Sequence, residues 1–306
     1  MVRFGKNGSD ATSAAIRLAR AYTGKEHVAV CGYHGWQDWY IGSTSRDLGV
    51  PQGVKDLTHT FIYNELASLE HILSANRGKM AAVIMEPMNT HYPEDNFLQK
   101  VKDLCHEHGA ILIFDETITG FRYGLGGAQQ LFNVTPDLAT FGKGMANGYP
   151  ISAVVGRKDI MLLMEDIFFS GTFAGETLSL AATKAVLNKI KRDNVLTHIH
   201  AMGKHLLTGL HQLLLDMKNP TWLKISGHPS WSFLHILDSE PYTSWQLKSL
   251  LLQEMAQRGI LLGGGHNLSF SHKLKDIDAL LNAYQEVLPL IATTINQKNF
   301  DQVFHG

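Results

Sequence analysis

The sequence predicts an α/β fold, in which a mainly parallel central sheet is flanked by helices and followed by a smaller α+β domain. The first observation is a set of short, continuously apolar runs at residues 28–30, 81–85 and 110–114, typical of strands covered on both faces. The second is that helical patterns, such as residues 13–22 and 96–107, lie between these runs. Strands that alternate with helices favour a parallel sheet, because parallel neighbours need a crossover connection.

The second half of the chain has a different pattern. Apolar residues spaced by three or four mark one face of a long helix: Ile199, Met202, Leu206, Leu210, Leu213 and Met217. Pro220 is expected to end this helix. Short strands are expected at residues 232–237 and 260–262, and a last helix around 276–288. We therefore predict a large domain at residues 1–190 and a small C-terminal domain at residues 191–306.

Composition argues against several kinds of partner. The formal net charge is −1, which gives no electrostatic reason to expect nucleic acid or an anionic membrane. No apolar run approaches the roughly 20 residues that a membrane helix needs. Two cysteines make no disulfide framework and fit reduced thiols, so we expect a cytoplasmic protein. Histidines gather at residues 198–211 without a cysteine or carboxylate to complete a site, so we expect no metal.

The chain opens on Arg3-Phe4, which reads as the end of a strand, and this predicts that N-terminal sequence is missing. A turn, Asn7-Gly8-Ser9-Asp10, then leads into a helix. Glycine lets the backbone approach an anion, the first N–H groups of the helix point toward it, and Ser9 can add a hydroxyl donor. The same residue types are ordinary helix caps, so an anion site and a cap are both open.

Asp115 directly follows the apolar run at residues 110–114. A carboxylate at the C-terminal end of a buried parallel strand lies where α/β folds bind ligands. A buried aspartate needs a cationic partner. A protonated pyridine nitrogen would be one, and a salt bridge or a capping role is the alternative.

Lys143 stands between two glycines after another apolar stretch. A lysine forms Schiff bases with carbonyl groups once desolvation or nearby positive charge lowers its pKa. Taken alone, this pattern also occurs in surface turns. A second turn of small residues, 171–175, precedes a helix and is either a phosphate contact or a tight loop.

The order and combination of these motifs resemble those of the class III aminotransferases, which have PLP fold type I, and in particular glutamate-1-semialdehyde aminomutase and its relatives. The matching stretches are residues 7–12, 33–35, 86–87, 115–122, 125–129, 135–138, 142–144 and 171–175. Asp115 and Lys143 also have the family's spacing of 28 residues. The resemblance implies pyridoxal 5'-phosphate (PLP) as the cofactor.

The resemblance also implies two catalytic residues and a phosphate site. Lys143 would form the Schiff base with PLP and then move a proton between substrate and cofactor. Asp115 would pair with the protonated pyridine nitrogen and keep the ring an electron sink. Gly8 and Ser9 would bind the phosphate at the start of their helix.

Four further residues would complete the cofactor site by the same resemblance. Tyr33 would stack on one face of the ring, and Thr117 would pack near the other. Glu86 would lie in the surrounding shell. Thr172 would reach the phosphate of a neighbouring subunit, because these enzymes are homodimers with the active site at the interface.

The implied reaction moves an amino group from an amino-acid donor to a small aldehyde or keto acceptor, a sugar-derived acceptor being one candidate. An aminomutase, which is an isomerase, is the alternative, as is a truncated PLP-binding protein with little activity. Two positions depart from the family. The glutamate characteristic of the aminomutase aligns with Gly264, and a glutamate that gates an arginine in other relatives aligns with His91.

Overall fold

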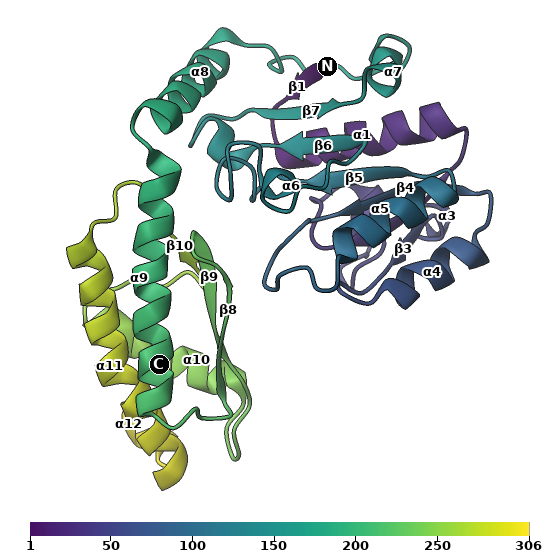
Figure 1. The fold of residues 1–306 in the computed structure, drawn as a ribbon. Helices are drawn as coiled ribbons and strands as arrows, with labels where there is room; N and C mark the ends of the chain where they lie inside the picture. Colours follow the sequence, from purple (N-terminus) through teal and green to yellow (C-terminus); the bar gives the residue numbers. More distant parts are fainter. Residues whose placement is uncertain (306) are drawn as a thin grey trace. The chain divides into compact units, whose positions relative to one another are not determined.

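The computed structural model describes residues 1–305, which form two compact units (Figure 1). The first unit contains Met1–Asn89 and Pro93–Asp193. The second contains Thr90–Tyr92 and the residues from Asn194 onward. Within the described residues, none of the helices combines the length and apolar character needed to cross a membrane.

The first unit is built on a seven-stranded sheet with the order β1-β7-β6-β5-β4-β2-β3. Its strands are β1 (Val2–Gly5), β2 (His27–Cys31), β3 (Thr58–Thr60), β4 (Met80–Met85), β5 (Ile111–Asp115), β6 (Leu138–Phe141) and β7 (Ser152–Gly156). Strands β3, β2, β4, β5 and β6 are neighbours in that order, and each pairs in parallel with the next. Strand β7 is antiparallel to both of its neighbours, β6 and β1. The mainly parallel sheet predicted from the sequence is therefore confirmed, and the three apolar runs lie in β2, β4 and β5.

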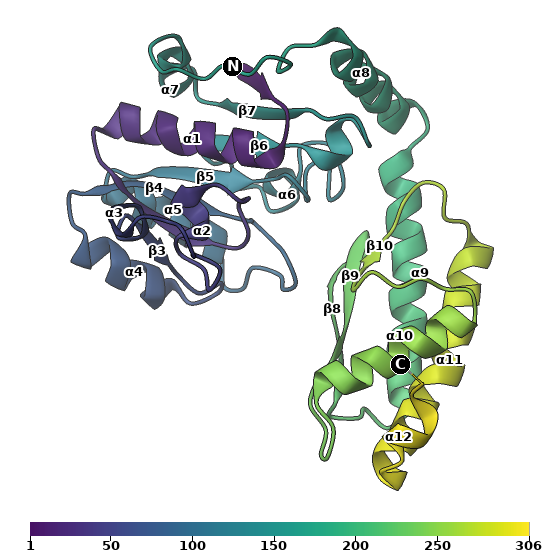
Figure 2. The same ribbon diagram turned by 180° about the vertical axis from the view of Figure 1, so that it is seen from behind.

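Helices cover both faces of this sheet. Helix α1 (Gly8–Thr23) packs on one face, whereas α4 (Leu66–Ala75) and α5 (Phe97–Glu107) pack on the other (Figures 1 and 2). Alternate side chains of each strand enter the two cores: in β5, Ile111 and Ile113 face α1, whereas Leu112 and Phe114 face α5. Burial on both faces explains why residues 28–30, 81–85 and 111–114 of these strands are all apolar.

Shorter elements connect the strands of the first unit. They are α2 (Asp38–Ile41), α3 (Gln52–Lys55), α6 (Ala128–Leu131), a 3₁₀ turn (Lys143–Met145), α7 (Lys158–Met161) and a second 3₁₀ turn (Leu162–Glu165). Helix α8 (Thr177–Arg192) closes the unit. Its first N–H groups are capped by Glu176, which accepts hydrogen bonds from the backbones of Leu178 and Ser179.

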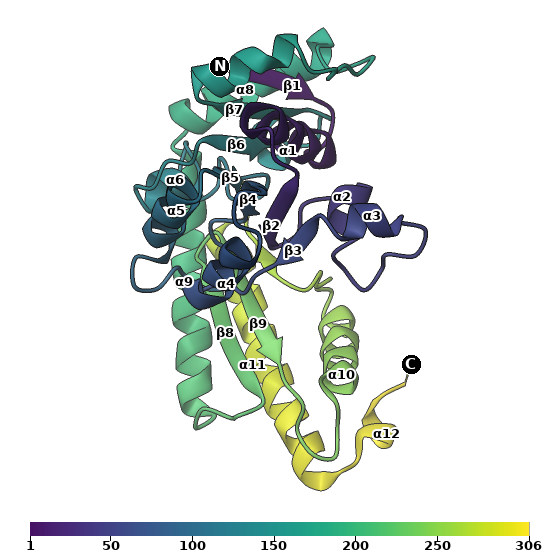
Figure 3. The same ribbon diagram turned by 90° about the vertical axis from the view of Figure 1, so that its right-hand side faces the viewer.

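The second unit contains a three-stranded antiparallel sheet of β8 (Leu223–His228), β9 (Trp231–Ile236) and β10 (His266–Asn267), with β9 in the centre. Its helices are α9 (Val195–Asp216), α10 (Ser244–Gln257), α11 (Leu274–Gln297) and α12 (Phe300–Val303). Helices α9 and α10 pack on the sheet, and α11 packs against both (Figure 3). Together these elements enclose one apolar core.

One predicted strand of this unit is absent, and one predicted helix is longer than expected. Residues 260–262 form no strand: Leu261 is 95% exposed, and three glycines follow before the chain pairs with β9 at His266. The last helix runs on past Leu288 to Gln297 and includes Pro289. It continues because its apolar face does: Ile291 and Ile295 are buried beyond the proline, so packing outweighs the hydrogen bond that proline removes.

Candidate active site

The C-terminal ends of the parallel strands surround a cavity of about 660 Å³ in the first unit. Seven residues predicted to contact the cofactor line it: Gly8, Ser9, Tyr33, Glu86, Asp115, Thr117 and Lys143. They come from segments more than a hundred residues apart in the chain, because parallel strands deliver the segments that follow them to one edge of the sheet. The eighth, Thr172, is exposed and is not part of this lining.

At one end of the cavity lies the N-terminus of α1. Asn7 caps the helix by accepting a hydrogen bond from the backbone of Asp10 (3.0 Å), and the Asp10 carboxylate accepts from the Asn7 backbone in return (3.2 Å). With the capping done by Asn7 and Asp10, the neighbouring Gly8 and Ser9 face the cavity. Both alternatives left open by the sequence are therefore compatible: the turn caps the helix and also presents an N-terminus to an anion.

The loop after β2 is fitted closely against this helix end. The Trp36 backbone donates a hydrogen bond to Ser9 Oγ (3.2 Å), which leaves the Ser9 hydroxyl proton free to donate. Gly35 has a φ of +104°, and a Cβ atom on it would lie 2.2 Å from Ser9 Oγ. Only glycine satisfies both the backbone conformation and the close approach.

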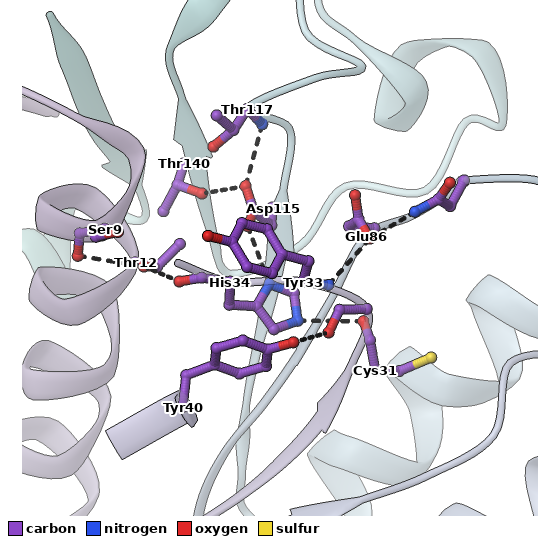
Figure 4. Close-up of polar contacts among 12 residues, drawn as sticks. Ser9, Thr12, Cys31, Tyr33, His34, Tyr40, Glu86, Asp115, Thr117 and Thr140 are labelled. Atoms are coloured by element: carbon purple, nitrogen blue, oxygen red, sulfur yellow. Dashed lines mark hydrogen bonds and ion pairs between the residues drawn. The ribbon is translucent and has the colours of Figure 1, made fainter. Parts of the chain in front are cut away.

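Asp115 lies at the other end, where β5 finishes, and is 5% exposed. Its Oδ1 accepts hydrogen bonds from the Thr117 backbone and the Thr140 hydroxyl, each at 3.1 Å (Figure 4). Its Oδ2 lies 2.9 Å from Nδ1 of His34. Burial alone would raise the pKa of Asp115, but the hydrogen bonds from His34 and Thr117 outweigh it and hold the pKa below its ordinary value. These hydrogen bonds favour the ionised form of the buried Asp115 carboxyl group.

Lys143 begins the 3₁₀ turn that follows β6 and reaches the same cavity. Its side chain remains accessible from the cavity. The surrounding protein nevertheless desolvates the amine and lowers the pKa of Lys143, an effect that Asp115 and Glu86 oppose and Arg122 reinforces. A lysine with a lowered pKa is more often neutral, which is the form that attacks a carbonyl carbon.

Glu86 places a second carboxyl group in the cavity and is 7% exposed. Its Oε2 accepts hydrogen bonds from the Tyr33 backbone (3.1 Å) and the Asn89 amide (2.8 Å). Burial and the nearby charge of Asp115 raise the pKa of Glu86. The hydrogen bond from the Tyr33 backbone to Glu86 fixes the position of Tyr33, a cavity residue that is 61% exposed.

Residues 1–267 match the family model for aminotransferase class III. The chain belongs to the class-III aminotransferases. It is 34% identical over 292 residues to 3-aminobutyryl-CoA aminotransferase of Cloacimonas acidaminovorans, covering 92% of this chain and 69% of that protein. It is 35% identical to glutamate-1-semialdehyde 2,1-aminomutase of Alkaliphilus oremlandii, covering 94% and 73%.

Solved structures of transaminases share the fold. An omega-transaminase from Sphaerobacter thermophilus superposes with a TM-score of 0.86 at 25% identity, covering 95% of this chain and 74% of that one. The FumI protein of Sphingopyxis sp. MTA144, in its PLP internal aldimine form, gives 0.86 at 27% identity, covering 96% and 72%. The chain therefore has PLP fold type I and is a PLP-dependent aminotransferase.

The cavity of this aminotransferase fits PLP by its own chemistry. An ionised carboxylate suits a protonated ring nitrogen, a lysine of lowered pKa suits an aldehyde, and a helix N-terminus suits a phosphate.

Several cavity residues were missed in the sequence. The most informative is His34, which stands between Tyr33 and Gly35 in a matching motif; the structure places its ring against Asp115. The aromatic residues that follow His34 have different environments. Trp36 lines the cavity, whereas Trp39 and Tyr40 are buried in the core. Only the fold distinguishes such neighbours, because a turn sends them to different sides.

Proposed function

We propose that this class-III aminotransferase moves an amino group from an amino-acid donor to a small aldehyde or keto acceptor, with a sugar-derived acceptor as one candidate. The observation that carries the proposal is the meeting of Lys143, Asp115 and the α1 N-terminus in one cavity. PLP, when bound, supplies an aldehyde that takes up the amino group and a ring that accepts electrons from the substrate carbon.

Each end of the cavity has a separate task in this proposal. Lys143 Nζ bonds to the cofactor, and once released it carries a proton to and from the reacting carbon of the substrate. The lowered pKa of Lys143 suits both tasks, because a neutral amine is the form that binds a carbonyl carbon and accepts a proton. Asp115 holds the proton of the ring nitrogen in place through its ionised carboxylate.

The remaining predicted residues bind and orient. Gly8 and Ser9 hold the phosphate with backbone N–H groups and a hydroxyl. The exposed ring of Tyr33 covers one face of the cofactor ring, and Thr117 packs near the other. Glu86 acts through Tyr33, whose backbone it holds.

We place Thr172 in a homodimer, where it would bind the phosphate of the partner chain. The supporting observation is that Thr172 is exposed and lies outside its own chain's cavity lining. Sedimentation should give a dimer, and Thr172→Ala should weaken PLP binding by about tenfold, or roughly 1.4 kcal/mol, as expected for one lost hydrogen bond to a charged group. A monomer that binds PLP at full affinity would contradict this assignment.

Net transfer is favoured over isomerisation by the position that aligns with the aminomutase glutamate. Gly264 has a φ of +98°, a conformation in which a glutamate would be strained. The relatives named aminomutase keep that reaction as the second candidate.

Amino-acid donors without an acceptor provide the test. If transfer is the reaction, a donor should convert the aldehyde form of the cofactor into the amine form, followed by absorbance, and added acceptor should reverse the change. Lys143→Ala is the control that should block it. Rapid isomerisation of glutamate-1-semialdehyde without any donor would instead assign the aminomutase reaction. Failure to convert with every donor would identify a PLP-binding protein with little activity.

A further inference from the structure

His34 joins three elements that form the cofactor cavity. It lies in the turn after β2, and its ring is completely buried. The backbone carbonyl of His34 accepts a hydrogen bond from Thr12 Oγ1 on α1 (2.8 Å). Its ring spans from the Cys31 carbonyl at the end of β2 (3.1 Å) to Asp115 at the end of β5 (2.9 Å; Figure 4).

Both ring nitrogens of His34 face hydrogen-bond acceptors. A carbonyl oxygen cannot donate, so Nε2 must carry a proton to bond with Cys31. One further proton is then needed between Nδ1 and Asp115 Oδ2, because a bare nitrogen facing a bare carboxylate would be repulsive. That proton belongs either to the imidazole, giving an ion pair, or to the carboxyl group, giving a neutral pair.

The other partners of Asp115 decide between these two arrangements. Oδ1 already accepts hydrogen bonds from Thr117 and Thr140, which stabilise the ionised carboxylate. A buried carboxylate also requires a cation within reach, and His34 is the group in direct contact. Lys143 and Glu86 also interact electrostatically with Asp115. The ring of Tyr40 lies edge-on to the His34 ring, with centroids 5.3 Å apart.

We propose that His34 is a buried imidazolium that supplies the counter-charge of Asp115 and acts as a positioning residue for that carboxylate. Its effect on catalysis rests on the proposed role of Asp115, but its protonation does not. By holding Asp115 ionised and tying it to the helix that receives the phosphate, His34 links the two ends of the cavity.

The chain contains a matched control for this protonation state. His266, in the second unit, is also buried and also hydrogen-bonded at both nitrogens, to Ser232 Oγ (3.0 Å) and to the Tyr284 hydroxyl (2.8 Å). Hydroxyl groups can accept or donate, so this ring needs only one proton. Burial lowers the pKa of His266 to about 4, which keeps it neutral.

NMR of isotope-labelled histidine ring nitrogens tests the proposal, since protonated and bare nitrogens resonate in separate ranges. The full chain is measured at neutral pH, with PLP and after its removal. We expect two protonated nitrogens for His34 and one protonated plus one bare nitrogen for His266. His34→Gln and His266→Gln assign the signals. A bare nitrogen in the His34 ring would overturn the proposal, whether or not the protein turns over any donor.

Two further variants keep the test independent of the stability of His34→Gln. Asp115→Asn removes the counter-charge, so the His34 ring should lose a proton and show a bare nitrogen; an unchanged ring would contradict the pairing. In His34→Asn, as in His34→Gln, the loss of the cation should raise the pKa of Asp115. The acid limb of the kcat profile should then move to higher pH, with kcat reduced roughly tenfold or more. A uniform loss at every pH, with the limb unmoved, would indicate a structural role alone.

Discussion

At the scale of single residues, Lys143 combines reactive chemistry with an unusual backbone. Its φ is +41°, in the left-handed region that side chains rarely adopt and that costs about 1–3 kcal/mol. Gly142 and Gly144 flank it, and the backbone of Met145 bonds back to Gly142 (2.9 Å). The turn thus directs the Lys143 side chain into the cavity. The free-energy cost of its positive φ is offset by the packing of the surrounding residues.

We expect Lys143→Ala to abolish covalent retention of PLP and to lower kcat by roughly 10²- to 10⁴-fold, the contribution of a positioned acid–base group. Borohydride reduction followed by peptide mapping is the measurement, and in the wild type it should link PLP to the peptide that contains Lys143. Lys6 also lines the cavity, so Lys6→Ala is the matched control and should still be labelled at Lys143. Labelling of another lysine in the wild type would contradict the assignment.

Asp115→Asn should reduce turnover more than cofactor affinity. Stabilising the protonated ring matters most when charge develops on it, so the loss falls on the transition state, and kcat should drop about 100-fold or more. Steady-state kinetics at saturating PLP, together with a PLP titration, separate the two effects. Normal turnover with weakened PLP retention would count against this role.

The contrast between Asp115 and His34 shows what a sequence reveals about a site. Asp115 could be predicted because a carboxylate after an apolar strand occupies a recognisable place in an α/β fold. The role of His34 could not, because it depends on which acceptors surround its two nitrogens. Those acceptors, Cys31 and Asp115, come from different strands and meet only after folding.

At the scale of elements, the proposed phosphate site depends on the fit between the β2 loop and α1. Gly35→Ala would place a methyl group against Ser9 and displace it, so PLP affinity should fall roughly 10- to 100-fold. Gly49→Ala is the control, because Gly49 has a similar φ of +90° but nothing within 4 Å of a Cβ. It should cost about 1 kcal/mol of stability and leave affinity unchanged. Equal losses of affinity, measured by titration, would show that backbone strain alone is responsible.

The elements themselves were predictable where their pattern was strong and local. Strand β4 and residues 111–114 of β5 could be predicted because both faces are buried and all of these residues are apolar. The small domain was harder to predict. Residues 260–262 are apolar enough for a strand, but the chain pairs with β9 only further on, at residues 266–267. Local composition does not reveal where that pairing begins. Pro289 in α11 shows the same limit, since long-range packing can override a residue that usually ends a helix.

At the scale of the whole molecule, one ion-paired cluster connects the layers of the first unit away from the cavity. Asp137 precedes β6 and is 3% exposed. Its carboxylate accepts hydrogen bonds from Arg157 after β7 (2.7 Å), His106 in α5 (3.0 Å) and the Leu112 backbone in β5 (2.9 Å). Asp137 lies at the N-terminal end of its strand, whereas Asp115 lies at the C-terminal end of the neighbouring strand. The Asp137 cluster should therefore affect stability and not the reaction.

Asp137→Asn should therefore lower the free energy of unfolding by about 1–3 kcal/mol at neutral pH with little change in kcat. Burial opposes ionisation of Asp137, but the bonds from Arg157, the Leu112 backbone and His106 outweigh it and hold its pKa low. Its stabilisation is complete above the ordinary aspartate pKa and is lost as the pH falls through the lowered one.

Urea unfolding across the acid range is the measurement, and the variant should show a shallower dependence on pH. Asp193→Asn is the control: Asp193 is also ion-paired, with Lys189 and Arg192, but on the surface. Solvent screens such pairs, so the control should change stability little. A larger effect from Asp193 than from Asp137 would contradict the role given to burial.

The alanine-rich face of α1 has a consequence for how this protein can accumulate mutations. Ala11, Ala14, Ala15 and Ala19 are at most 3% exposed against the sheet. Alanine has no alternative rotamers, so a larger residue here cannot be absorbed by side-chain rearrangement and must lift the helix. Substitutions among the long side chains beneath α5 can be repacked locally. The two faces should therefore tolerate mutations unequally, because an enlarged residue beneath α1 should displace the helix whose N-terminus lines the cavity.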